Sequence, residues 1–169
     1  LAPFDIDIKI AHKDGQCFVD IGGFNSMFFD DFFVVRQDGT FSFAPSLVFT
    51  SKETVIVESL PLLMINTELS KKVTHVVGSF DISKWVRPVE WAFILNEDTT
   101  LSIKRGDPIF CVRFATPNNE IVKLERFYPD QLFENIHAAC VQAKLLQKGM
   151  SLKKMYEMAE PILKLWRKK

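Results

Sequence analysis

The sequence predicts a mainly β protein, either a sandwich, a jelly roll or a β-clip-like small barrel, with a C-terminal two-helix extension. Short apolar stretches separated by turn residues, about nine to eleven of them, recur through the first 128 residues, which is typical of strands. From residue 129 onward, apolar residues recur at helical spacing instead. The 16 phenylalanines, against two tyrosines, also favour β structure, because aromatic side chains fit pleated surfaces.

The first strands are predicted by alternation. Residues 4–10 are alternately apolar and charged, which predicts a strand with one wet face. A turn over 13–16 and a strand over 17–21 complete a first hairpin. Asp38-Gly39 is the turn signal of a second hairpin, between residues 34–36 and 41–43. The phenylalanine-rich stretch 24–35 stays unassigned.

The middle of the chain predicts several more short strands. They are expected over residues 54–57, 60–65 (or the approach to a strand), 74–80, 89–95, 101–103, 109–114 and 121–127. Lys71-Lys72 is expected in a wet loop, and Asn118-Asn119 in a hairpin turn. Gly106 would supply the special backbone angle of a tight turn, and Asp107 would cap its amides.

The C-terminal residues predict two helices. Pro129 suits an early position of the first helix and Gly149 its end. Ser151 is a good N-cap for the second helix, which Pro161 should kink. We therefore expect a β domain over residues 1–128 and a helical extension over 129–169, packed on that domain or on a neighbouring subunit.

Charge is balanced overall but unevenly distributed. Residues 1–128 carry a net charge of −4 and residues 129–169 a net charge of +4. Because the chain has no net charge and its first 128 residues carry no positive excess, nucleic acid is an unlikely partner, since nucleic-acid binding needs a basic face. The amphipathic, basic C-terminal helix is expected to contact a sister subunit, and a partner protein or an anionic surface is the alternative. The sequence thus predicts a homo-oligomer.

Metal and cofactor signatures are lacking. The cysteines lie far apart and without metal-ligand spacing, as do the histidines: Cys17, Cys111, Cys140, His12, His75 and His137. No dinucleotide or phosphate-binding glycine motif is present. We expect no metal and no cofactor. No apolar run approaches the roughly 18–20 residues of a membrane span, and no cleavable signal pattern opens the sequence, so a cytoplasmic protein with reduced, buried thiols is expected.

Two segments could carry chemistry. The first combines two tryptophans with charged residues, and the second is a basic turn. Their candidate ligand-binding residues are Trp85, Arg87, Glu90, Trp91, Lys104 and Arg105, and the candidate catalytic residue is Asp81. Asp81, Arg87 and Glu90 would form either a charge cluster at a cleft or a solvated rim.

Both segments resemble the dUTPase and dCTP-deaminase superfamily. Gly78 and Asp81 match its glycine, two residues and catalytic aspartate, and residues 103–109 match its Ile-x-x-Gly-Asp-x-Ile stretch. Asp20-Ile21-Gly22 resembles the start of the family's first motif, and Pro61 lies where the second would begin. The resemblance implies a nucleotide site with Asp81 as water-activating base, and with Arg87 and Lys104 or Arg105 on the phosphates.

The sequence also departs from that family. Leu62-Leu63-Met64 stands where the family has its phosphate-binding Arg-Ser-Gly, and Phe24 or Asn25 fills an acidic position. The glycine-rich C-terminal arm is replaced by helices. A triphosphate would then meet an apolar surface, which would be costly. The resemblance covers about a third of the chain and implies a fold more than an activity.

A second resemblance is to an uncharacterised bacterial and phage family of small β domains. Trp85, Trp91 and Gly106-Asp107-Pro108-Ile109 are similar to its tryptophan-rich strand and following turn. It implies no known activity. Lacking a complete catalytic set, the sequence predicts a non-enzymatic, self-associating β-domain protein of phage or bacterial accessory type. A degenerate dUTPase-like nucleotide binder or hydrolase, or a small-molecule-binding jelly roll, is the alternative.

Overall fold

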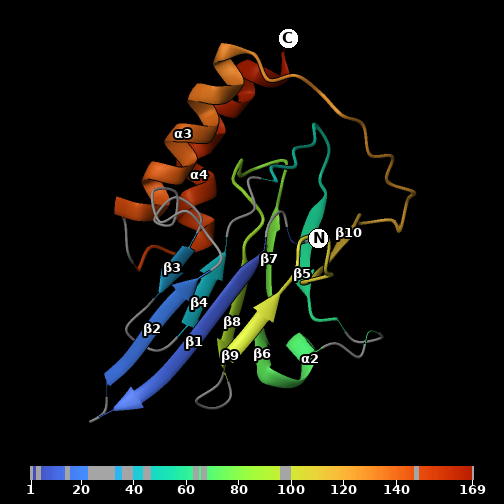
Figure 1. The fold of residues 1–169 in the computed structure, drawn as a ribbon. Helices are drawn as coiled ribbons and strands as arrows, with labels where there is room; N and C mark the ends of the chain where they lie inside the picture. Colours follow the sequence, from blue (N-terminus) through green and yellow to red (C-terminus); the bar gives the residue numbers. More distant parts are fainter. Residues whose placement is uncertain are drawn as a thin grey trace. The chain divides into compact units, whose positions relative to one another are not determined.

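The computed structural model is mainly β, with two long helices at its C-terminal end, which confirms the predicted fold class at this level (Figure 1). It describes ten strands in three sheets. The described residues are 2, 5–13, 16–22, 33–35, 40–43, 47–62, 65, 68–95, 100–146 and 149–168. Most of the unassigned phenylalanine-rich stretch lies outside them, as do residues 14–15 and Asp38-Gly39 of the two predicted hairpin turns.

The chain divides into two compact units. The first comprises residues 1–47, 59–78 and 89–112. The second comprises residues 48–58, 79–88 and 113–169. The two C-terminal helices therefore share a unit with two internal stretches of the β region, and each unit is described by itself below.

The first hairpin is confirmed and forms one sheet of the first unit. Strand β1 (Ile6–Lys13) pairs antiparallel with β2 (Gln16–Gly22) and with β9 (Thr100–Ile103), in the order β2-β1-β9 (Figure 1). On β1 the isoleucines 6 and 8 are buried and Lys9 is exposed, as the alternation predicts. Opposite faces of the strand thus meet the core and the solvent.

The second hairpin is also confirmed, within a four-stranded sheet of the same unit. Its order is β3 (Phe33–Val35), β4 (Thr40–Phe43), β8 (Trp91–Leu95) and β6 (Val73–Val76), with antiparallel pairs throughout. Its register places aromatic residues opposite one another on β4 and β8, and such cross-strand pairs stabilise a sheet.

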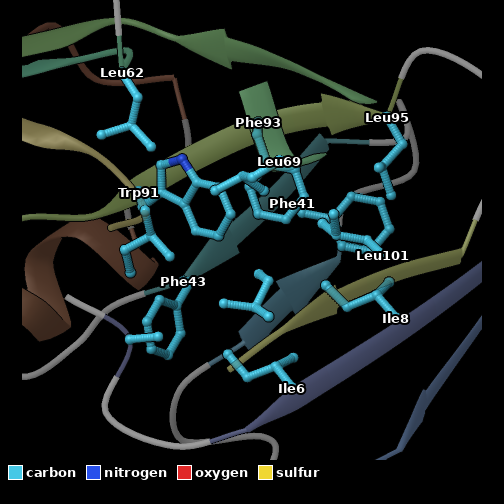
Figure 2. Packing of buried hydrophobic residues seen from close by; sticks show 13 residues of the cluster. Ile6, Ile8, Phe41, Phe43, Leu62, Leu69, Trp91, Phe93, Leu95 and Leu101 are labelled. Carbon is cyan, nitrogen blue, oxygen red and sulfur yellow. The ribbon is translucent and has the colours of Figure 1, made fainter. Parts of the chain in front are cut away.

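The core of the first unit draws on both of these sheets. β1 and β9 contribute isoleucines and leucine, and β4 and β8 contribute stacked aromatic rings (Figure 2). Phe93 stacks on Phe41 at 5.3 Å and on Trp91 at 4.0 Å between ring centroids. The members of the cluster are Ala2, Ile6, Ile8, Phe41, Phe43, Leu62, Leu69, Trp91, Phe93, Leu95, Leu101, Ile103 and Ile109.

The predicted wet loop at Lys71-Lys72 is wrong, since both residues end the short helix α2 (Glu68–Lys72). Glu68 forms ion pairs with both lysines, at 3.9 and 3.2 Å, across one helical turn. Leu69 is buried in the core cluster and anchors the helix. A helix of five residues is too short to produce a recognisable apolar period.

The third sheet has the order β10 (Cys111–Ala115), β5 (Ile56–Leu60) and β7 (Gly78–Asp81), and most of its residues belong to the second unit. Strand β5 begins two residues later than the predicted strand 54–57. The Ile82 N–H donates to the carbonyl of Val55 at 3.0 Å, which continues the contact of these segments beyond β7.

The second unit also contains the two long helices, α3 (Gln131–Leu146) and α4 (Leu152–Arg167), which lie side by side (Figure 1). Asp130 is the N-cap of α3, because its carboxylate accepts the Phe133 N–H at 2.8 Å, and Pro129 lies before the helix rather than in its first turn. Gly149 lies between the helices with a φ of +91°. The predicted N-cap of α4 is confirmed, since the Ser151 side chain accepts the Lys154 N–H.

The predicted strand over 121–127 is wrong. The chain turns after β10, with Asn119 at a φ of 55°, but this turn is not the predicted hairpin turn, because no strand follows it among the described residues. Residues 119–130 then belong to no helix or strand. Apolar alternation indicates that a segment suits a strand, but a strand also needs a neighbour to pair with, and none of the described residues pairs with this one.

Candidate functional site

The candidate catalytic residue Asp81 closes a tight turn of the second unit. Its Oδ1 accepts hydrogen bonds from the Ser83 N–H at 2.9 Å and the Ser83 hydroxyl at 2.6 Å. Its Oδ2 is 3.0 Å from the Lys84 ammonium. Its carbonyl accepts the N–H groups of Lys84 and Trp85. With 3% of its surface exposed, Asp81 directs both carboxylate oxygens into its own turn.

Helix α4 holds this turn from the other side. The Tyr156 hydroxyl accepts the Asp81 N–H at 2.7 Å, and the Arg167 guanidinium donates to the Ser83 carbonyl. Arg167 also pairs with Glu160 at 3.4 Å. Burial is the main cause of a raised pKa at the Tyr156 hydroxyl, so this group stays neutral as a hydrogen-bond partner. Sequence analysis missed Tyr156 and Arg167, because nothing in the helical pattern points to a polar contact.

The other candidates of this unit serve the packing around the turn. The Arg87 guanidinium lies over the Phe80 ring, 4.3 Å from its centroid, in a cation–π contact. Trp85 is buried almost completely and lines a groove between α3 and α4. The structure thus places Asp81, Trp85 and Arg87 in one unit, in and next to one turn.

The remaining candidates belong to the first unit. Trp91 is part of the buried aromatic stack, so its ring faces the core rather than a ligand. The Glu90 carboxylate accepts the Ser42 hydroxyl at 3.0 Å. Both side chains thus contact other residues of the first unit.

Lys104 and Arg105 lie in the predicted tight turn, which is confirmed. Gly106 has a φ of +89°, and the Asp107 carboxylate accepts the Lys104 N–H at 2.8 Å. The Asp5 carboxylate accepts the Arg105 N–H at 2.8 Å and pairs with the Lys104 ammonium at 3.2 Å. These contacts, above all the Arg105 N–H, lower the pKa of Asp5. The Lys104 ammonium therefore already has a carboxylate partner.

One serine–histidine pair occurs in the first unit. The Ser59 hydroxyl lies 3.0 Å from Nε2 of His75, and burial lowers the pKa of His75. A neutral imidazole beside a hydroxyl is half of a nucleophilic arrangement. However, Ser59 is buried, and Nδ1 of His75 has no orienting partner among the described residues. The pair is therefore arranged as a buried hydrogen bond.

Two cavities occur in the second unit, each of about 120 Å³. One is the apolar groove between the helices, with alanines and Cys140 on α3 facing Met158 and Ile162 on α4. The other is covered by residues 122–127 and backed by Phe49 and Phe114, which contact edge to face at 5.0 Å. Among the described residues, eight of the 13 exposed large apolar side chains also belong to this unit.

Those exposed apolar side chains gather on two features. The linking segment, residues 121–128 between β10 and α3, exposes 98% of Ile121 and 85% of Tyr128, and Leu124 is also exposed. The outer stripe of α4 consists of Met155, Met158, Ile162 and Leu165, and the last three are exposed.

Of the helices in the described residues, none has the length and apolarity to cross a membrane. The same residues contain no group of three side chains suited to hold a metal ion. No protein-family model, curated protein or solved structure matches the chain. The two family resemblances therefore stay predictions.

Proposed function

We propose that this is a non-enzymatic protein that self-associates, with the linking segment of one copy pairing with the linking segment of a second. The contact would be an antiparallel strand pair formed by residues 121–127 of both copies. In this proposal the β region of the first unit is a sandwich, since its two sheets contribute to a single core.

The observation that supports the proposal is that the linking segment has both exposed apolar side chains and backbone groups without a partner strand. Its large apolar side chains, Ile121, Leu124 and Tyr128, face solvent. Within the described part of the chain, its backbone groups also form no backbone hydrogen bond. A second strand would satisfy both deficits at once, by covering apolar surface and completing a ladder, as in β-strand addition.

The sequence of the segment complements itself. If two copies pair antiparallel about Leu124, the two leucines face each other and Ile121 faces Phe127 of the other copy. The same register places Lys123 opposite Glu125, twice by symmetry. Opposite charges and large apolar side chains are both favourable cross-strand partners, at about 0.2–1 kcal/mol for each pair. A contact of a surface with its own copy is what two-fold symmetry requires.

One contact within the segment is compatible with a strand. The Lys123 ammonium lies 2.6 Å from the Glu125 carboxylate of its own chain. In an extended backbone, side chains two residues apart lie on one face, so the pair fits such a conformation. Consecutive residues of the segment line the cavity beside Phe49 and Phe114, whereas Ile121 at its start is 98% exposed. The lining residues are Val122, Lys123, Leu124, Glu125 and Phe127.

The alternatives receive less support. A dUTPase-like hydrolase needs a carboxylate free to activate water, and both oxygens of Asp81 are held by Ser83 and Lys84. A ligand-binding jelly roll needs a pocket, and neither of the two cavities that the described residues of the second unit form, at about 120 Å³ each, reaches the roughly 300–1,000 Å³ of ligand sites. Self-association requires neither a free carboxylate nor a ligand-sized pocket.

The test is a charge exchange, read by sedimentation velocity across a wide concentration series. Wild type is expected to dimerise, and Lys123→Glu or Glu125→Lys alone to weaken the dimer by about tenfold, because each places like charges opposite each other. The double variant K123E/E125K should restore it. Val77→Glu, an exposed apolar position of the first unit, is the matched control. A monomeric wild type, or singles without effect, would overturn the proposal.

A further inference from the structure

Helix α4 has apolar side chains on its buried face and also on an adjacent, exposed part of its surface. Ala159 and Leu163 are buried, and Trp166 packs on Phe133 with ring centroids 5.7 Å apart. These positions form the inner face of the helix, spaced by three or four residues. In the outer stripe defined above, Met158, Ile162 and Leu165 each directly precede one of these three residues in the sequence. The stripe therefore lies beside the buried face of the helix.

Three of the four residues of the outer stripe are exposed, and Met155 is half-buried. Leu165 is 62% exposed, and Met158 and Ile162 are also exposed. From Met155 to Leu165 the stripe is about 15 Å long, at 1.5 Å per residue. It continues into the apolar groove, where Met158 and Ile162 face the alanines of α3. The result is a continuous apolar strip on one side of the helix pair.

Lysines flank this strip. Lys154 precedes Met158 by four residues and Lys168 follows Leu165 by three, so each lies in line with the stripe at one of its ends. Lys153 and Lys164 are exposed farther round the helix. Of the two acidic residues of α4, Glu160 is already paired with Arg167 and Lys164. The exposed surface of α4 outside the strip is therefore mainly cationic, with Glu157 as its exposed acidic residue.

We propose that α4 binds the surface of an anionic lipid bilayer, with the outer stripe among the acyl chains and the lysines at the headgroups. An amphipathic helix with a lysine-rich polar side and an apolar side lies in the plane of a bilayer interface in this way. The anionic headgroups complement the lysines, and each cation near such a surface adds to the attraction. The contact uses surface separate from the linking segment, so it does not depend on self-association.

The competing occupant is an acidic amphipathic helix of a partner protein. A peptide helix would have to sit in the short groove between α3 and α4 and would leave Leu165, which does not line it, uncovered. A bilayer surface covers the whole stripe, including Leu165, together with the lysines at both of its ends. This difference favours the lipid surface.

The experiment is co-sedimentation of the full chain with vesicles of phosphatidylcholine, with and without phosphatidylserine. Binding is expected only with phosphatidylserine and should weaken as salt rises, because salt screens the lysines. Leu165→Gln and Lys154→Glu should each lower the apparent affinity roughly tenfold, through the apolar and the ionic contribution respectively. Circular dichroism of each variant verifies the fold.

Two controls separate this proposal from others. Val77→Glu, on the first unit, should leave vesicle binding unchanged. Lys123→Glu, which weakens the proposed dimer, should still bind vesicles measurably. No binding to phosphatidylserine vesicles would overturn the proposal, as would equal binding to both vesicle types or no effect of Leu165→Gln. A chain that binds an acidic helical peptide but no vesicles would indicate the protein partner instead.

Discussion

The hydroxyl of Tyr156 accepts the backbone N–H of Asp81 at 2.7 Å, across 75 residues of sequence. This contact ties α4 to the turn that follows β7. The N–H group it satisfies belongs to a residue that is 3% exposed. A buried N–H without a partner costs free energy, so the tyrosine is a structural part of the turn.

Replacing this tyrosine tests the contact. Tyr156→Phe removes only the hydroxyl and leaves the Asp81 N–H unpaired, so the free energy of unfolding should fall by about 1–3 kcal/mol. Urea denaturation measures the change. Tyr128→Phe is the matched control, because the Tyr128 side chain is largely exposed and should tolerate the same deletion. Equal stability of the two variants would contradict the assigned role.

Replacing Asp81 distinguishes a structural from a catalytic carboxylate. Asp81→Ala leaves the N–H and hydroxyl of Ser83 without their acceptor, which should lower the free energy of unfolding by about 1–3 kcal/mol. Asp81→Asn retains an acceptor oxygen and should lose less. A catalytic residue is often replaced without loss of stability. An Asp81→Ala protein as stable as wild type would therefore argue for the catalytic role.

Much of the fold was predictable because it is local. The alternation of residues 4–10 and the Asp38-Gly39 signal predict two hairpins, and both are present. Ser151 as N-cap and Gly106 as the turn residue are also confirmed. Each depends on a few neighbouring residues, whose chemistry is visible in the sequence alone.

The site was less predictable because it depends on distant partners. Asp81 stands in a recognisable pattern, yet Tyr156 and Arg167 reach its turn from a helix more than 70 residues later. The misassigned strand over 121–127 has the same cause. The alternation of apolar and polar residues shows that the segment suits a strand, whereas its pairing depends on which other strand lies next to it.

The thiols should differ sharply in reactivity. Cys111 is exposed, whereas Cys140 is buried and burial raises the pKa of its thiol, which lowers the thiolate fraction. In a Cys17→Ser background, a chromogenic disulfide reagent should titrate one thiol rapidly in the native protein and the second only after unfolding. Cys111→Ser in the same background should abolish the rapid phase. A rapid phase that persists would mean that the α3 thiol is accessible.

We expect the free energy of unfolding to fall in mild acid because of two partly buried histidines. Burial lowers the pKa of His75 and of His137 below the unfolded value near 6.5. As pH falls through that value, the unfolded chain takes up protons first, so stability is full above it and declines toward the folded pKa. Urea unfolding at pH 7.5 and at pH 5.5, on either side of about 6.5, should show this decline. His75→Gln and His137→Gln should each reduce it, since each removes one proton-binding group from the unfolded chain. Carboxylates titrate mostly below this window, and the lowered pKa of Asp5 moves that group farther from it. An unchanged decline in both variants would assign the acid sensitivity to other groups.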